Sequence, residues 1–193
     1  LGIYAALILA LGGLHVDGVR IGAAALVLTL YTYPYVYLPV AAAFFRSLDP
    51  EITIKLLVEE GAEVSAGTDI MQLEGNARAM LTAERSALNT VQHLSGVATL
   101  TRAYVRAMDN ASCTLLDTRK TIPGLRLAQK YAVRVGGGQN QRLALWHGIL
   151  IKENHIMAAG GIAQAIAKAH EIAPGKAVEV EVETWDELNQ ALE

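Results

Sequence analysis

The sequence contains a single cysteine, Cys113, among 193 residues. One cysteine cannot form a disulfide within the chain, so the fold of these residues does not depend on one. This scarcity fits a reducing compartment, and we expect a cytoplasmic protein. Because an unpaired cysteine usually behaves as a small apolar residue, we predict that Cys113 is buried in a strand.

Charge is also scarce. Charged residues make up 18% of the sequence and hydrophobic residues 52%, and the net charge is −3 with a pI of about 6.0. Proteins that bind nucleic acid normally carry a basic excess, so we expect no nucleic-acid partner and only a local basic site. The length allows one large domain or two small ones, and it is sufficient for a real hydrophobic core.

No charged residue occurs in the first fourteen positions or between Ile21 and Phe45. By length alone the second run could span a bilayer. Two prolines, four tyrosines at 31–37 and the lack of a clear helical stripe argue against this, and no basic segment precedes the first apolar run as in a secretory signal. We therefore expect no membrane partner, with a membrane span kept as the alternative. Residues 1–43 resemble a natural soluble sequence much less than the rest, and they support no fold prediction.

Lysine is absent between Lys55 and Lys120. Residues 52–56 alternate between apolar and polar side chains, which predicts a half-buried strand. Apolar residues then recur around Gly61 and Gly67, as in short strands joined by tight turns. Biotin and lipoyl carrier domains share this spacing, but they need a modifiable lysine at a hairpin tip. We therefore interpret this segment as structural.

A long helix is predicted over 82–108, with Thr82 as its N-terminal cap. Apolar and small residues recur every three or four positions from Leu88 to Val105, which indicates one packed face with Gly96 as a point of close approach or bending. Arg85 would then lie in the first turn, where a cation is mildly unfavourable. A surface arginine is the default interpretation, but this placement makes Arg85 a candidate functional residue.

Strands are predicted near 113–117, 148–152 and 177–182, with helical segments between them and another helix capped by Thr184 and Glu187. Such alternation is typical of a parallel sheet. Three strand–helix units do not close a barrel, so the fold is either an open sheet or an incomplete barrel, and we favour the incomplete barrel. The last strand carries Glu179, Glu181 and Glu183 on one face, and we expect at least one of them to be functional.

Cations gather where the first two of these strands end. Arg119 and Lys120 follow the first strand, Lys152 and His155 follow the second, and Arg142 lies between them. Ligands bind at the carboxyl ends of parallel strands, so these residues predict a site for a polyanion. The alternative is a set of salt-bridged surface loops that use Asp117 and Glu153. The glycines at 136–138 would let the backbone turn sharply or approach a ligand.

Five segments in this order resemble the quinolinate phosphoribosyltransferase family over about residues 44–193. They are ERSALNTVQHLSGVATLT (84–101), LLDTRKTIPGLR (115–126), KYAVRVGGGQNQR (130–142), LIKENHI (150–156) and VEVEVETWDEL (178–188). The resemblance implies an N-terminal α/β sandwich domain with a long connecting helix at 1–108. At 109–193 it implies part of an open, TIM-like α/β barrel, truncated after about three strand–helix units.

The resemblance also implies an activity, which is phosphoribosyl transfer from phosphoribosyl pyrophosphate to quinolinate with loss of CO₂ in NAD biosynthesis. Arg119 and Arg142 would bind the quinolinate carboxylates, and Lys120 and Lys152 would neutralise phosphate groups. Glu181 would hold the ribose hydroxyls, so that Lys120, Lys152 and Glu181 form the catalytic set.

The remaining implications concern partners. Mg²⁺ would bind the pyrophosphate, and no protein side chain is assigned as its ligand. The protein would be a homodimer with shared sites, to which Arg85 is donated by the other subunit. Thr118 and His155 complete the predicted substrate-binding residues.

The sequence departs from the family at three places. Gln141 stands where the family usually has histidine, residues 1–43 do not match, and the later barrel strands with their phosphate loops are absent from the sequence. Two alternatives therefore stay open. One is a related phosphoribosyltransferase that acts on another pyridine or azole acid, and the other is a non-enzymatic anion-binding module.

Overall fold

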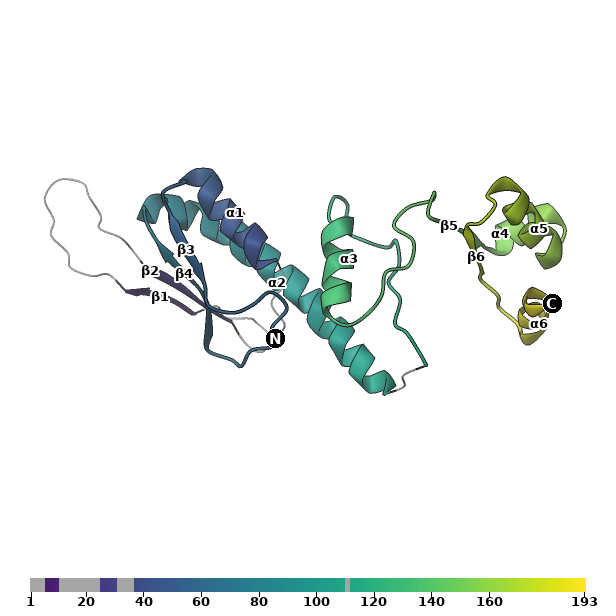
Figure 1. Ribbon diagram of the computed structural model, residues 1–193, viewed down its shortest axis with the longest axis horizontal. Helices are drawn as coiled ribbons and strands as arrows, with labels where there is room; N and C mark the ends of the chain where they lie inside the picture. The colour runs from purple at the N-terminus through teal and green to yellow at the C-terminus, as the bar shows by residue number, and fades with distance from the viewer. Residues whose placement is uncertain (1–5, 11–24, 31–36, 110–111) are drawn as a thin grey trace, which may run out of the picture. The chain divides into compact units, whose positions relative to one another are not determined.

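The computed structural model describes residues 6–10, 25–30, 37–109 and 112–193 (Figure 1). Its elements in chain order are β1 (Ala6–Ala10), β2 (Ala25–Leu30), α1 (Leu38–Leu48), β3 (Thr53–Leu56), β4 (Thr68–Glu74), α2 (Ala77–Met108), α3 (Arg126–Val135), β5 (Gly148–Ile151), α4 (Glu153–Ala159), α5 (Ile162–Ile172), β6 (Ala177–Val180) and α6 (Trp185–Leu192). They form two compact units, each with its own core. Unit 1 comprises 1–117 and 121–140, and unit 2 comprises 118–120 and 141–193.

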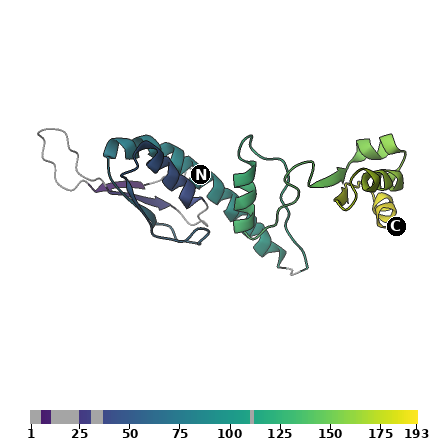
Figure 2. The same ribbon diagram turned by 45° about the horizontal axis from the view of Figure 1, so that its top comes forward.

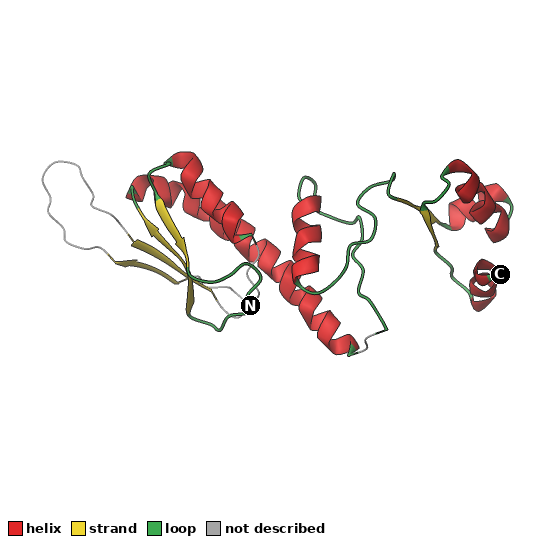
Figure 3. Cartoon of the chain, in the orientation of Figure 1, coloured by secondary structure: helices red, strands yellow, loops and turns green. Residues whose placement is uncertain are grey.

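Unit 1 contains an antiparallel sheet with the strand order β1-β2-β4-β3 (Figure 3). β3 coincides with the alternating segment at 52–56, so that predicted strand is confirmed. Between β3 and β4, Gly61 and Gly67 have φ values of 82° and 83°. Only glycine adopts this left-handed conformation readily, and the predicted turn role of both glycines is therefore correct.

Helices α1 and α2 pack together against one face of this sheet (Figure 2). Their shared core includes the fully buried Leu38 and Phe45 of α1, Leu73 of β4 and Val91 of α2. α1 begins where Glu60 accepts hydrogen bonds from the backbone N–H groups of Tyr37 and Leu38. A carboxylate is favourable at this positive end of a helix, so a distant loop fixes where α1 starts.

α2 begins at Ala77, five residues before the predicted start, so the prediction that Thr82 caps it is wrong. The side chain of Asn76 accepts hydrogen bonds from the N–H groups of Arg78 (3.0 Å) and Ala79 (3.2 Å), which otherwise have no partner in the first turn. Thr82 lies inside the helix and donates to the carbonyl of Arg78. Arg85 therefore lies in the third turn, and the argument that it disturbs the first turn is also wrong.

The C-terminal half of α2 packs against α3. A side chain at Gly136 would meet the carbonyl oxygen of Ala98 at 2.5 Å, and one at Gly138 would meet Val133 at 2.8 Å. These glycines therefore permit close packing and a turn after α3, where Gly137 has a φ of 95°. Gly96 faces open space within a continuous helix, so its predicted role as a close-approach or bend point is wrong.

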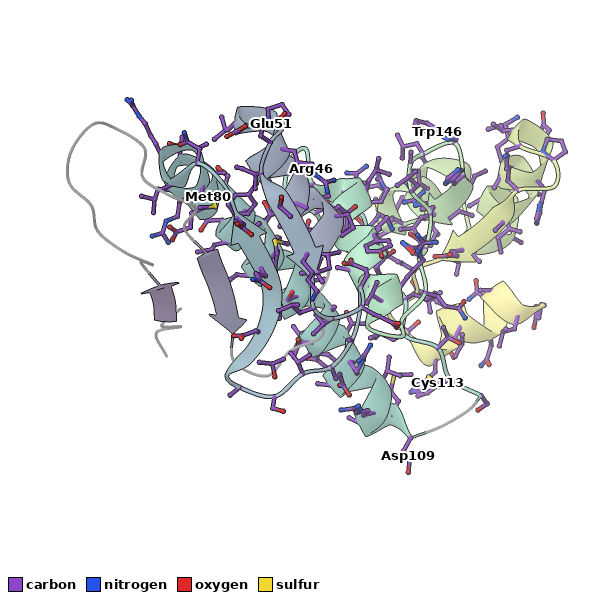
Figure 4. All side chains as sticks on the ribbon, turned by 60° about the vertical axis from the view of Figure 1, so that its left-hand side comes forward. Arg46, Glu51, Met80, Asp109, Cys113 and Trp146 are labelled. Carbon is purple, nitrogen blue, oxygen red and sulfur yellow. The ribbon has the colours of Figure 1, made fainter. Side chains whose placement is uncertain are left out.

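The strand predicted near 113–117 does not form. Only Leu116 pairs, through a single parallel bridge to Gln139. The loop after α3 contributes just this one residue to the pairing, so no strand forms. Cys113 lies in the loop that follows α2 and is exposed, since no sheet covers it (Figure 4). Its predicted burial in a strand is wrong.

Unit 2 is built on a parallel pair, β5 and β6, with Ile151 paired to Val180. These strands confirm the predictions near 148–152 and 177–182. Ile151, Ala165 and Ala169 form the centre of its core, and Val178 and Val180 pack against them. α5 and α6 confirm the predicted helices, and Thr184 and Glu187 form the predicted capping box at α6.

The uncharged N-terminal run lies partly outside the described residues, including most of 1–36. Within the part of the chain that is described, no helix combines the length and apolarity needed to cross a bilayer. The described parts of the two uncharged runs form β1, β2 and the start of α1.

Candidate functional site

Lys152 and Glu181 meet where β5 and β6 end. Lys152 directly follows β5, and Glu181 directly follows β6. The N–H of Glu181 donates to the carbonyl of Ile151 at 2.9 Å. The Lys152 ammonium lies 2.8 Å from the Glu181 carboxylate, and both side chains are about half exposed. The parallel pairing thus places a cation and an anion side by side at the carboxyl ends of the strands, as the sequence predicts.

His155 lies in the first turn of α4, close to the same strand end. Its Nδ1 accepts a hydrogen bond from the backbone N–H of Lys152 at 3.0 Å. An accepting Nδ1 carries no proton, so a neutral imidazole here is protonated at Nε2. His155 also lines an apolar cavity of 340 Å³ between β5 and α5. The structure therefore gives His155 a role in fixing the Lys152 backbone, and its substrate-binding role stays a prediction.

Arg142 is held at the other end of β5. Its Nη1 donates to the carbonyl of Gly148 at 3.2 Å, and Gly148 precedes Lys152 by about 13 Å of strand. The Arg142 Nε is buried and has no hydrogen-bond partner among the described residues. A buried N–H without a partner is costly, so this atom marks a place for an acceptor.

Gln141 and Glu179 form a second contact across this unit. The Gln141 amide donates to the Glu179 carboxylate at 2.9 Å. Glu179 pairs with Leu150 in the strand register, so this contact lies beside the middle of the β5–β6 pair. Glu179 and Glu181 alternate with half-buried valines along β6 and just after it. Glu179 contacts Gln141 and Glu181 contacts Lys152, so each carboxylate contacts a segment that the sequence predicts for the site.

Residues 118–120 form a turn that belongs to the same unit. The Thr118 hydroxyl accepts from the N–H of Lys120 at 3.1 Å. Arg119 is half-buried, and the exposed Lys120 ammonium has no partner within the described residues. Glu153, the other predicted salt-bridge acceptor, accepts from Asn154 and forms no ion pair among those residues. The salt-bridged alternative is therefore unsupported at Glu153 and Lys120.

Arg85 belongs to unit 1, whereas the other predicted site residues belong to unit 2. Its side chain is exposed on α2, and in the described part of the chain nothing pairs with its guanidinium. The structure thus leaves Arg85 available for an external anion and does not test its predicted donation to a second subunit.

The sequence reasoning missed a buried ion pair. Lys130 on α3 is 3% exposed and binds the Asp117 carboxylate, and the Asn140 amide donates to the same carboxylate at 3.0 Å. Lysine is almost never fully buried unless it is paired. The signal in the sequence is Lys130 itself, a cation within α3, where Ala132 is the other buried residue.

The described residues hold no group of three histidine, cysteine, aspartate or glutamate side chains that could bind a metal ion. A cation that enters this site would therefore need oxygen ligands from a substrate or water in addition to a side chain such as Glu181. Mg²⁺ commonly binds in this way, through one or two carboxylates and the phosphates of a substrate.

Family models and known proteins match most of this chain. A family model described as the C-terminal domain of quinolinate phosphoribosyl transferase matches residues 97–193, and the corresponding N-terminal domain model matches 38–95. The chain belongs to the quinolinate phosphoribosyltransferase family. The match confirms the resemblance seen in the sequence, and the described part of the fold, with its small sheets and many helices, is consistent with family members.

Individual family members match over most of this chain. A probable nicotinate-nucleotide pyrophosphorylase [carboxylating] from Synechocystis is 44% identical over 156 residues, which cover 80% of this chain and 53% of the relative. The Mycobacterium leprae nicotinate-nucleotide pyrophosphorylase [carboxylating] is 47% identical over 135 residues, covering 70% and 48%. The solved structure of the Francisella tularensis nicotinate-nucleotide pyrophosphorylase has 48% identity and a TM-score of 0.83, covering 89% and 61%. The chain thus spans about half the length of the curated relatives it matches.

Proposed function

We propose that this protein transfers the phosphoribosyl group of phosphoribosyl pyrophosphate to quinolinate and releases pyrophosphate and CO₂, giving nicotinate mononucleotide for NAD biosynthesis. The observation that carries the proposal is the contact of Lys152 with Glu181 at the carboxyl ends of β5 and β6. A polyanionic pair of substrates that reacts at a sugar carbon requires both a cation and a carboxylate at the same place.

Glu181 has the chemistry needed at the ribose. When the pyridine nitrogen attacks C1 and pyrophosphate leaves, the sugar passes through an oxocarbenium-like state that a nearby carboxylate stabilises. Lys152 would neutralise the phosphate oxygens on the leaving side. Because an exposed ion pair contributes only about 0–1 kcal/mol to stability, Lys152 and Glu181 can separate to bind substrates at little cost.

The other cations would bind the dicarboxylate. Arg119 and Arg142 offer planar guanidinium groups that match a carboxylate through two hydrogen bonds, and the partnerless Nε of Arg142 supports this role. Lys120 would add a compact charge near a phosphate, with Thr118 and His155 completing the pocket. Pairing of these charges is essential because desolvated, unpaired anions would bind very unfavourably.

Mg²⁺ would serve as the metal of this reaction, held mainly by the pyrophosphate and water. Glu181 is the described carboxylate best placed to contribute, since it follows β6 and contacts Lys152. When bound, the ion would offset the negative charge that develops on the leaving group. The surrounding side chains would orient the two substrates, and this positioning would supply much of the rate.

At the level of the whole protein, we propose that β5 and β6 belong to an open α/β barrel and that the enzyme is a cytoplasmic homodimer. The support for the barrel is the parallel strand pairing and the charged strand ends. The support for a shared site is Arg85, an exposed arginine on α2 with no partner among the described residues.

The direct test is incubation of the intact protein with quinolinate, phosphoribosyl pyrophosphate and Mg²⁺. We expect nicotinate mononucleotide and CO₂ in equal amounts, and no nucleotide when nicotinate replaces quinolinate. Nucleotide formation with nicotinate but without quinolinate turnover would contradict the proposal, as would the absence of any product from folded protein.

A second candidate is phosphoribosyl transfer to another pyridine or azole acid. The observation in its favour is Gln141, which pairs with Glu179 where the family pattern has histidine. Glutamine can donate and accept hydrogen bonds but carries no charge, so it would favour an acceptor acid with less negative charge. A panel of mono- and dicarboxylic heteroaromatic acids in the same assay distinguishes the two, because the second candidate requires a better substrate than quinolinate.

A further inference from the structure

The Asp117 carboxylate, the Lys130 ammonium and the Asn140 amide form a hydrogen-bonded network within unit 1. Lys130 binds one carboxylate oxygen of Asp117. Asn140 donates to the other at 3.0 Å and to the Lys130 carbonyl at 3.1 Å. The side chains of Lys130 and Asp117 are only 4% and 7% exposed, so this ion pair is removed from water.

The backbone joins the same two stretches of chain. The N–H of Asp117 donates to the carbonyl of Gln139 at 3.1 Å, and the N–H of Gln139 donates to the carbonyl of Leu115 at 2.8 Å. Asp117 and Asn140 are the last residues of unit 1 before the chain enters unit 2, at Thr118 and at Gln141. The network therefore ties together the starting points of the two segments that carry Arg119 and Arg142.

We propose that Asp117, Lys130 and Asn140 are positioning residues that set the spacing between the Arg119–Lys120 segment and Arg142 for binding of the aromatic dicarboxylate. None of the three needs to touch the substrate. This inference rests on the proposed function, since it assigns the network to the carboxylate-binding part of that site.

Stability alone does not explain why this ion pair is buried. Desolvation of two charges offsets most of their attraction, and apolar residues of the same size often stabilise a protein equally well or better. A buried ion pair with hydrogen bonds to fixed partners is instead directional, and it defines one geometry for the groups attached to it. Two carboxylate-binding arginines on separate segments need such a fixed spacing, because a displacement of about 1 Å can cost about 100-fold in rate.

The test uses two variants of the intact protein. Asn140→Ala removes an exposed side chain together with its two hydrogen bonds. The double variant Asp117→Asn/Lys130→Met removes both buried charges and so leaves neither charge unpaired. Gln139→Ala is the matched control, because this exposed neighbour uses only its backbone in the contacts between the two stretches. Melting temperatures establish that each variant is folded.

Two readouts are measured for each variant. We expect the KM for quinolinate to rise about 10-fold in Asn140→Ala and about 10- to 100-fold in the double variant, the range for loss of hydrogen bonds to a charged group. The KM for phosphoribosyl pyrophosphate should rise less, and the control should match the wild type. In parallel, amide hydrogen exchange at 118–120 and 141–142 should be faster in both variants than in the control.

The outcomes separate the two proposals. Wild-type protein that does not convert quinolinate contradicts the proposed function, while the exchange data still decide whether the network holds these segments. Unchanged exchange in both variants overturns the positioning role. Faster exchange with unaltered kinetic constants overturns it as well, because the network would then be structural only. Equal increases in both KM values also contradict a specific effect on the dicarboxylate.

Discussion

At the residue scale, Gly136 has a role that its sequence context does not reveal. Three consecutive glycines suggest a backbone that approaches a ligand, but here the chain approaches another helix. The position of a side chain at Gly136 is occupied by the Ala98 carbonyl and by Thr101 of α2. Since interiors are close-packed, an added methyl group must displace the backbone of a neighbouring helix.

We predict that Gly136→Ala lowers the stability of unit 1 by about 1–3 kcal/mol, the usual cost of overpacking. Gly96→Ala is the matched control, because Gly96 is an exposed position within α2 and nothing lies within 4 Å of a side chain placed there. That substitution should stabilise the protein by about 0.5–1 kcal/mol. Urea unfolding followed by circular dichroism measures both. Equal effects of the two substitutions on the free energy of unfolding would contradict the prediction, because the close contact between Gly136 and α2 would then not restrict the side chain at position 136.

Lys152 is expected to matter for activity and hardly at all for stability. Lys152→Met and Glu181→Gln should each lower kcat by about 10²–10³-fold, the loss typical of a removed transition-state contact. The melting temperature should change little, since the pair is half exposed. Lys168→Met provides the control, because Lys168 forms a similarly exposed pair with Glu171 at 2.9 Å in the same unit. A comparable loss of activity in the control would contradict a special role for Lys152.

At the element scale, periodicity predicted which face of α2 is buried but not where the helix begins. Leu88, Val91 and Ala98 all lie in the core as expected. The start was misplaced because Thr82 is a typical N-cap residue, whereas Asn76 follows directly after a strand and a glycine. Whether Asn or Thr caps depends on which side chain reaches free N–H groups, and that is a property of the folded turn.

The parallel strands of unit 2 were predictable, because β5 is an apolar run that ends in charge and β6 alternates apolar and acidic residues. The strand near 113–117 was not, since a strand needs a partner and the sequence does not state which segment lies beside it. The same reason explains why the contact between Lys130 and Asp117 was missed, while the neighbouring Arg119 and Lys120 were selected. Long-range pairing decides each of these cases, and local pattern carries little information about it.

Another element-scale contact links Glu63, in the loop between β3 and β4, to Arg102 and Arg106 of α2. Hydrogen bonding to Arg106 lowers the pKa of Glu63 from 4.5, with a smaller contribution from Arg102, which lies 3.3 Å away. A carboxyl whose pKa is depressed in the folded state stabilises the fold above its unfolded pKa, and this contribution is lost as the pH falls through the folded pKa.

We therefore predict that Glu63→Gln reduces the melting temperature slightly at pH 7 and that the difference disappears in acid, below the folded pKa of Glu63. Because the pair is exposed, 0.5 M salt should also diminish the difference at pH 7. Glu59→Gln, in the same segment, is the control. A difference that persists unchanged in acid would show that Glu63 acts through packing and not through its charge.

At the scale of the whole molecule, the chain places its candidate groups in two units with separate cores. Lys152, Glu181 and Arg142 belong to unit 2, whereas Arg85 belongs to unit 1. An arginine on the exposed face of a 32-residue helix is well suited to reach a neighbouring subunit, because the helix is anchored along its length by α1 and α3. If the subunits of a homodimer share their sites, two inactive variants with substitutions on different sides of the site should regain activity when they are mixed.

We predict that Arg85→Ala and Lys152→Ala are each nearly inactive alone and recover activity when mixed. In a mixed dimer, one site receives both substitutions and the other receives neither, so random exchange of subunits should restore about a quarter of wild-type activity. Denaturation and joint refolding of equal amounts, followed by the quinolinate assay, measures the recovery. The control mixes Glu181→Ala with Lys152→Ala, where both substitutions affect the site of their own subunit and every site stays defective. Recovery in neither mixture would contradict the donation of Arg85, because the intact site expected in the mixed dimer would then not exist.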